Sequence, residues 1–194
     1  MPSPAPALAY GLDDLIAELD ALVASERDPR RIIGRASDSV RRLVAREGAL
    51  PERFLRATNP SGTTRNLVHK HPQGRYVVLA VLWPPGYETP VHDHEAWGVS
   101  GVHEGAVRVT NYVRTDDGSR AGHASLEEHS SLVAGRGSVT YVLPPAEEIH
   151  KIGNPTAERA VTLHVYGRDM LDCNVFDLNT GRISRLDMVY HNLV

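Results

Sequence analysis

The 194 residues are enough for one domain with a sizeable core, and 41% hydrophobic with 23% charged residues is typical of a soluble globular protein. A formal net charge of −3 gives no reason to expect a nucleic-acid partner, and no stretch approaches the ~18 to 20 apolar residues that a membrane span needs. The only cysteine, Cys173, excludes an intramolecular disulfide and fits a reducing compartment. The N-terminus lacks the cationic segment and long apolar run of a signal peptide, so we expect a cytoplasmic protein.

Two helices are predicted before residue 60. Residues 1–7 are rich in Pro and Ala and are expected to form a loose tail. From Leu8 to Val23, and again from Pro29 to Arg46, apolar residues recur at the three- and four-residue spacing of an amphipathic helix. We expect residues 1–60 to be a helical extension packed on the rest of the chain.

Short strands are predicted after residue 60. Tyr76–Trp83 is a β-branched and aromatic run between Gly and Pro residues, which is typical of a buried strand. Many short strands separated by Gly and Pro favour a β-sandwich or small barrel over residues 61–194, in one structural domain with the extension. The remaining strands are predicted at Trp97–His103, Ala106–Arg114, Ser131–Ala134, Ser138–Leu143, Ile149–Ile152, Ala160–Tyr166, Asn174–Leu178 and Arg182–Asp187.

Three histidines form a candidate metal site. In a strand, His92 and His94 would project to the same face, while Asp93 would point the other way. His150, on the later strand predicted at Ile149–Ile152, is the best third ligand. Neutral imidazoles bind Fe(II), Zn(II), Cu(II) and Ni(II), and the spacing alone does not choose among them, because three His also describe a catalytic zinc site. The histidines without such a context are interpreted as surface or core residues: His69, His71, His103, His123, His129 and His191.

A second group of polar side chains shares one strand face. In TLHVY, the side chains of Thr162, His164 and Tyr166 alternate onto the same side. A buried Tyr hydroxyl close to a metal needs a hydrogen-bond partner, and a His two residues away can supply one. Taken alone, Tyr166 would be interpreted as a core aromatic residue.

These motifs resemble those of the cupins. The usual cupin Glu ligand, three or four residues after the second His, is missing, because Trp97 to Val99 occupy those positions. Three His without this carboxylate is similar to the cysteine dioxygenase family. The resemblance implies a mainly β fold, a cupin double-stranded β-helix (jelly-roll barrel) with an N-terminal helical extension. The two cupin motifs are matched by Gly86-x5-His92-x-His94 with a later Gly105, and by His150-x3-Asn154.

The same resemblance assigns roles. It implies that His92, His94 and His150 hold Fe(II). TLHVY looks like the family's Ser-x-His-x-Tyr triad, in which Tyr166 would donate a hydrogen bond to oxygen or substrate, His164 would orient it and Thr162 would complete the chain. Residues 63–68 (TTRNLV) resemble the carboxylate-binding segment, with Arg65 presenting two parallel donors to the substrate carboxylate.

The predicted activity is an iron-dependent thiol dioxygenase that adds both atoms of O2 to the sulfur of L-cysteine, in sulfur amino acid metabolism. Its partners are a small thiol and O2, with no nucleic acid and no membrane. Arg65 favours cysteine, because members that prefer 3-mercaptopropionate tend to carry Gln there. Animal members cross-link a cysteine to the active-site Tyr; no such cysteine lies near Gly98, so we predict no cross-link. In lacking the cross-link, the chain resembles bacterial members, including 3-mercaptopropionate dioxygenases, which argues against the preference indicated by Arg65.

Two alternatives stay open, and one departure bears on the triad. The chain could be a different cupin oxygenase or isomerase that uses Fe, Mn or Ni. It could also be a non-catalytic metal-binding cupin that binds a small ligand or regulates another protein. Thr162 replaces the usual Ser of the triad, which keeps the hydroxyl and adds a methyl group.

Overall fold

The computed structural model describes residues 10–193, and the predicted tail of residues 1–7, with Leu8, lies outside them. The two predicted helices are present as α1 (Leu12–Ser25) and α2 (Pro29–Val44), followed by a short 3-10 helix, η1 (Glu52–Phe54). The strands are β1 (Thr64–Lys70), β2 (Val77–Trp83), β3 (Val91–His92), β4 (Gly98–Glu104), β5 (Ala106–Arg114), β6 (Leu126–Gly135), β7 (Val139–Val142), β8 (His150–Gly153), β9 (Ala160–Tyr166), β10 (Asp172–Phe176) and β11 (Ile183–Asp187).

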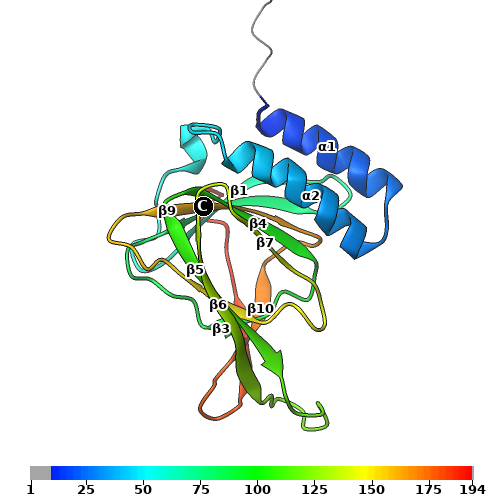
Figure 1. Ribbon diagram of the computed structural model, residues 1–194, viewed down its shortest axis with the longest axis vertical. Coiled ribbons are helices and arrows are strands. Elements are labelled where there is room, and N and C mark those ends of the chain that lie inside the picture. Colours follow the sequence, from blue (N-terminus) through cyan, green and yellow to red (C-terminus); the bar gives the residue numbers. More distant parts are fainter. Residues whose placement is uncertain (1–9, 194) are drawn as a thin grey trace, which may run out of the picture.

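The strands form two antiparallel sheets (Figure 1). One has the order β1-β2-β9-β4-β7, and the other has the order β11-β10-β3-β8-β5-β6. A single buried cluster takes Leu79 and Val81 from the first sheet and Val107, Val109 and Ile152 from the second, so the inner faces pack against each other. The mainly β cupin jelly-roll with an N-terminal helical extension is confirmed.

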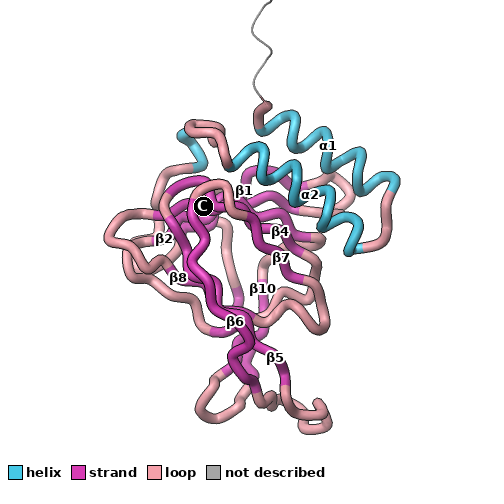
Figure 2. Tube along the Cα trace, viewed as in Figure 1, coloured by secondary structure: helices cyan, strands magenta, loops and turns pink. Residues whose placement is uncertain are grey.

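The helices cover the outer face of the five-stranded sheet (Figures 1 and 2). Alternate residues of β2, Val78, Ala80 and Leu82, pack with the apolar faces of α1 and α2, while the intervening residues face the other sheet. Every residue of β2 and of β9 is buried. Burial on both faces explains why β2 reads as a continuous hydrophobic run rather than as an alternating one.

Helix α2 approaches β4 closely at Gly101. A Cβ atom there would lie 2.6 Å from Cγ1 of Val40 and 3.0 Å from the Val44 side chain, and the first distance is shorter than real Cβ atoms adopt. The missing side chain therefore lets the helix lie directly on the sheet. This contact fixes the helical extension to the strand that neighbours β9.

Two strand predictions are corrected. Strand β3 contains only Val91 and His92, so His94 lies beyond its end; Glu95 then takes a left-handed conformation, with φ of 52°, that turns the chain. Strand β6 begins at Leu126 rather than at the predicted Ser131. The sequence did not indicate its first half, because those residues are largely solvent-exposed and show no apolar alternation.

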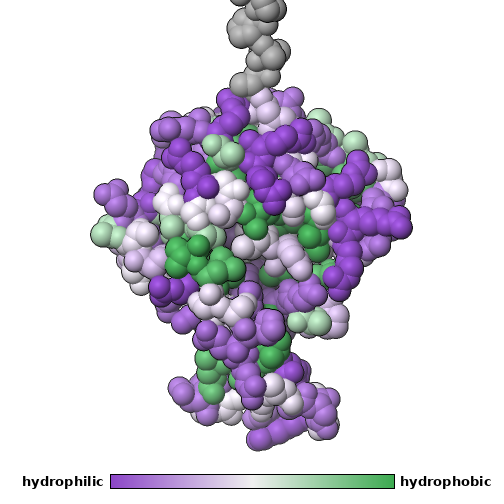
Figure 3. Space-filling model, in the orientation of Figure 1, coloured by the Kyte–Doolittle hydropathy of each residue, from purple (hydrophilic) through white to green (hydrophobic). Residues whose placement is uncertain are grey.

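The face drawn in Figure 3 is mostly hydrophilic, with small hydrophobic patches. Among residues 10–193, neither helix is long and apolar enough to cross a lipid bilayer.

Candidate metal centre and active site

The three predicted histidines come together between the sheets. His92 and His150 are direct cross-strand partners in β3 and β8, and His94 follows two residues after His92. One ring nitrogen from each of the three lies within 4.8 Å of the others. The ring centroids are 4.7 to 4.9 Å apart, so the imidazoles converge on one point.

These histidines suit a metal ion. Burial lowers the pKa of His92, and burial together with the neighbouring imidazoles holds the pKa of His94 and His150 well below the usual value. All three rings are therefore neutral at pH 7 and carry a lone pair. Nδ1 of His94 and Nε2 of His150 are buried without a hydrogen-bond partner among the described residues. Unpaired buried nitrogens are costly, and metal coordination would satisfy them.

The TLHVY residues form a hydrogen-bonded chain on the inner face of β9. Thr162 Oγ1 lies 2.6 Å from Nε2 of His164, whose Nδ1 lies 2.8 Å from the Tyr166 hydroxyl. The hydroxyl is 3.2 Å from Nε2 of His94, and the two rings stack at 5.0 Å. The chain thus leads directly to the histidine cluster. We call Thr162, His164 and Tyr166 the relay.

Two residues that sequence reasoning missed extend the relay. The Trp83 indole N–H donates to Thr162 Oγ1 at 2.8 Å, and Ser100 Oγ lies 2.8 Å from Nδ1 of His164. Ser100 is directly opposite His164 in the sheet register, so only the pairing of β4 with β9 could have revealed it. Trp83 gave no signal beyond its place at the end of a hydrophobic run.

The donors and acceptors give the relay a direction. The Trp83 indole can only donate, so Thr162 accepts from it and its own hydrogen is available for Nε2 of His164. Burial lowers the pKa of His164 to about 3, so the ring is neutral. A neutral ring that accepts at Nε2 carries its proton on Nδ1, beside the Tyr166 oxygen. The Tyr166 hydrogen is then free to point toward the metal centre, and burial raises the Tyr166 pKa so that the hydroxyl keeps it.

Arg65 lies in the same cavity and is held by the C-terminal segment. Its Nη2 donates to the Met170 carbonyl at 2.6 Å and its Nη1 to the Val189 carbonyl at 3.3 Å. The guanidinium carbon is 5.5 Å from the Tyr190 ring centroid, and the Arg65 backbone N–H donates to Nδ1 of His191. Burial lowers the Arg65 pKa from its very high ordinary value, which leaves a cation at pH 7.

A cavity of about 150 Å³ connects these groups. His92, His94, Arg65 and Tyr166 line it, whereas His150 contacts the other two imidazoles and does not line the cavity. The remaining wall is largely apolar and includes two methionines and a cysteine. Its apolar residues are Leu79, Val81, Ile152, Met170, Cys173, Leu186 and Met188.

Asp93 turns away from the histidines, as expected for the residue between them. Its carboxylate accepts from the backbone N–H and the side-chain amide of Asn174 in β10. Gly98 faces Tyr166: a Cβ atom there would lie 2.6 Å from Cδ1 and 2.7 Å from Cε1 of the ring. The absence of a Cys–Tyr cross-link stays a prediction.

The sequence matches the model of the family described as cysteine dioxygenase type I over residues 34–179, about three quarters of the chain. The chain belongs to this family. The cysteine dioxygenase membership predicted from the motifs is therefore confirmed.

The chain also matches individual proteins, at lower identity. Human and cattle cysteine dioxygenase type 1 are 25% and 24% identical over 131 residues, which cover 66% of this chain and 62% of theirs. The match thus spans less than two thirds of the relatives' length. An oxalate oxidase in complex with the substrate analogue glycolate is 19% identical with a TM-score of 0.45, covering 61% of this chain and 59% of its own. An RmlC-like cupin from Ralstonia eutropha is 19% identical with a TM-score of 0.44, covering 68% of this chain and 70% of its own. These scores are low, and the fold assignment rests on the sheets and the family.

Proposed function

We propose that this protein is an iron-dependent thiol dioxygenase that converts L-cysteine to cysteine sulfinate. In the reaction R–SH and O2 give R–SO2H, so both oxygen atoms go to sulfur and no further reductant is consumed. The observation that supports this most is a cluster of three converging neutral histidines, two of which line a small cavity together with a Tyr side chain and an Arg side chain. His92, His94 and His150 would hold Fe(II), which supplies O2 activation and favours the thiolate form of the substrate.

Arg65 would bind the substrate carboxylate. Two backbone carbonyls take one N–H from each of its terminal nitrogens, so a carboxylate can accept the N–H groups that remain. Because those carbonyls hold the guanidinium in place, little side-chain freedom is lost when the substrate binds. The substrate is thereby oriented with its thiol toward the histidines.

Tyr166 would donate a hydrogen bond at the reacting end of the substrate. With the His164 proton on Nδ1, the Tyr166 oxygen accepts from this N–H, and the hydroxyl hydrogen can point toward the substrate. The largely apolar wall excludes water and strengthens these contacts. The protein's contribution is positioning and electrostatics.

One observation favours a second substrate, 3-mercaptopropionate. Within residues 10–193, the cavity is lined by no Asp or Glu. The ammonium group of free cysteine would find no carboxylate there, whereas 3-mercaptopropionate has no amine to pair. Arg65 serves the carboxylate of either compound.

Oxygen uptake by the anaerobically Fe(II)-loaded protein, with L-cysteine and 3-mercaptopropionate side by side, tests the proposal. Faster turnover of cysteine to its sulfinate is expected. Faster turnover of 3-mercaptopropionate would make that compound the substrate, and the proposed thiol dioxygenase reaction would be retained. Metal binding without uptake of either would leave a non-catalytic metal-binding cupin or another cupin enzyme. We also propose that the protein acts in the cytoplasm, where a single unpaired cysteine suits reducing conditions.

A further inference from the structure

The backbone of His94 is held by side chains on both sides. Its N–H donates to Oε2 of Glu148 at 3.3 Å, and the next N–H, of Glu95, donates to the same oxygen at 2.8 Å. The His94 carbonyl accepts from Nε of Arg168 at 3.0 Å. Because β3 ends at His92, the sheet ladder does not position His94, and these side chains take that place.

Glu148 and Arg168, the two residues that hold the His94 backbone, each lie close in sequence to another residue of the site. Glu148 lies two residues before His150, and Arg168 lies two residues after Tyr166. One side chain therefore connects His94 to the strand of the third histidine, and the other connects it to the strand of the relay. His94 is the residue at which the metal centre and the relay meet, through its contact with the Tyr166 hydroxyl.

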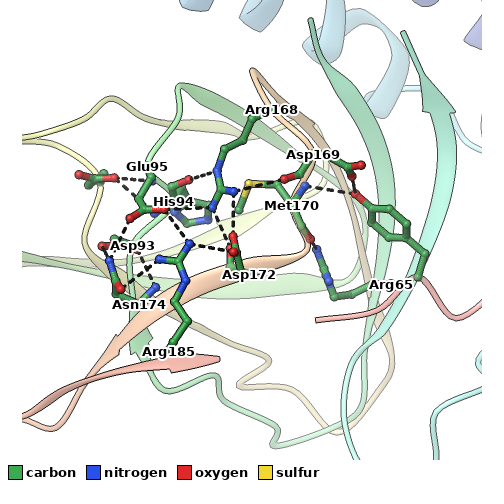
Figure 4. Close-up of polar contacts among 12 residues, drawn as sticks. Arg65, Asp93, His94, Glu95, Arg168, Asp169, Met170, Asp172, Asn174 and Arg185 are labelled. Atoms are coloured by element: carbon green, nitrogen blue, oxygen red, sulfur yellow. Dashed lines mark hydrogen bonds and ion pairs between the residues drawn. The ribbon is translucent and has the colours of Figure 1, made fainter. Parts of the chain in front are cut away.

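Arg168 is itself tightly held (Figure 4). Nη1 donates to Oδ1 of Asp172 at 2.8 Å and to the Asp169 carbonyl at 3.4 Å. Nη2 donates to the Asp172 carbonyl at 2.9 Å and to Oε2 of Glu95 at 3.4 Å. Together with the His94 contact, these interactions use every N–H of the guanidinium, so the side chain has a single placement.

The segment that is held is also strained. Glu95 has a left-handed φ of 52°, which costs free energy for a residue with a side chain and persists only where the surroundings impose it. Glu148 accepts from the Glu95 N–H, and Arg168, which also donates to the His94 carbonyl, pairs with the Glu95 carboxylate. Without these contacts the turn after His94 would relax and carry the imidazole with it.

We propose that Glu148 and Arg168 are positioning residues of the metal centre, which hold His94 at the distance from His150 and Tyr166 that metal binding requires. The inference rests on the proposed metal centre. Loss of either side chain weakens metal binding without removing a ligand. Loss of Arg168 also changes the placement of the His94 ring against Tyr166.

The test is a Co(II) titration of the metal-free full chain in competition with a chelator, read from the visible absorption of bound cobalt. Glu148→Ala and Arg168→Gln are expected to raise the Kd about 10- to 100-fold, as loss of partners behind metal ligands commonly does. Glu148→Gln keeps an acceptor oxygen for the two N–H groups and should stay close to the wild type. Thermal unfolding of each metal-free variant shows whether it remains folded.

Arg185 supplies the matched control. It pairs with Glu95 and Asp172 in the same cluster, but no bond joins it to the His94 backbone. Arg185→Gln removes the same charge and should change the Kd by less than about fivefold, the range of an exposed ion pair.

The outcomes separate the two proposals. A wild-type chain that binds no Co(II) and no Fe(II) overturns the metal centre itself. A wild type that binds, with Glu148→Ala and Arg168→Gln binding equally well, overturns the positioning role alone. Equal weakening by Arg185→Gln also overturns it, since net charge would then be the cause. If Arg168→Gln does not fold, Arg168→Lys and the two Glu148 variants decide the question. A Glu148→Gln variant that binds Co(II) as weakly as Glu148→Ala contradicts the proposal.

Discussion

Strands β9 and β3 both bring functional side chains to the cavity, but the fold holds them differently. Strand β9 has seven buried residues and pairs with β2 and β4 along its length. Strand β3 has two residues, each of its pairings is short, and His94 lies beyond its end. Backbone register positions the relay, whereas side chains hold the backbone of His94 in the proposed metal centre. Relay variants should therefore change chemistry at constant metal content, and metal-centre variants should change metal content first.

The largest effect is expected from removal of a ligand. His150→Ala should abolish both iron binding and turnover, because two imidazoles alone do not make a protein metal site of this kind. Iron content after anaerobic loading and desalting measures the loss. His129→Ala, an exposed histidine of β6, is the control. Full iron content in His150→Ala would remove that residue from the site.

The next effect concerns the relay alone. Tyr166→Phe removes the hydroxyl beside His94 and leaves His164 bonded to Ser100. We expect turnover to fall about 100-fold or more at unchanged iron content, the scale of a lost proton donor. Steady-state oxygen uptake with iron analysis measures both, with exposed Tyr141→Phe as control. A parallel fall in iron content would show that the two regions are not separable.

Arg65→Ala should act on substrate binding. Loss of a charge-assisted hydrogen bond is expected to raise KM about 10- to 100-fold with iron content unchanged. A thiol without a carboxylate, such as cysteamine, serves as the control, because its kinetics should not respond to the substitution. If the KM for cysteine stays the same, Arg65 does not bind the carboxylate.

Gly98→Ala tests how rigidly the sheet holds Tyr166. The added methyl would lie 2.6 Å from the Tyr166 ring and 2.9 Å from Val142, so we expect a loss of about 1 to 3 kcal/mol in the free energy of unfolding. Gly135→Ala, which meets open space, is the matched control in urea denaturation. Equal stability of the two variants would mean that Tyr166 can move aside freely.

The most gradual effect is that of pH on the metal-free protein. The His164 pKa is about 3 in the folded state, below the ordinary 6.5 of an unfolded chain. Between these values the unfolded state binds the extra proton, so stability should fall as the pH is lowered below 6.5, by about 1.4 kcal/mol per pH unit for each such histidine. Urea denaturation at several pH values should show that the free energy of unfolding changes less steeply with pH in His164→Gln than in the wild type. An equal slope would show that His164 is not neutral in the folded state.

The contrast between β9 and β3 also explains what the sequence could predict. Thr162, His164 and Tyr166 follow a period of two within one strand, so their shared face is a local property. His92 and His150 are far apart in sequence, so no periodicity links them; His150 was chosen for its place on a later strand and then matched the second cupin motif. His94 was expected on the same strand as His92, and the strand ends before it.

Residues that act across elements gave no local signal. Ser100 meets His164 only through the register of β4 with β9, and Glu148 and Arg168 reach His94 only after the loops have folded. The start of β6 was missed because an exposed edge strand needs no apolar pattern. Local patterns thus predict strands and faces, while contacts between loops depend on the assembled barrel.

Cys173 completes the wall of a cavity that we propose for the oxidation of thiols. Burial is the main cause that raises the pKa of this side chain to about 11. At neutral pH it therefore remains a protonated thiol, whereas the thiolate is the form that binds metals and reacts with oxidants. The protein can thus keep a sulfur atom of its own beside the proposed reaction without that sulfur being oxidised.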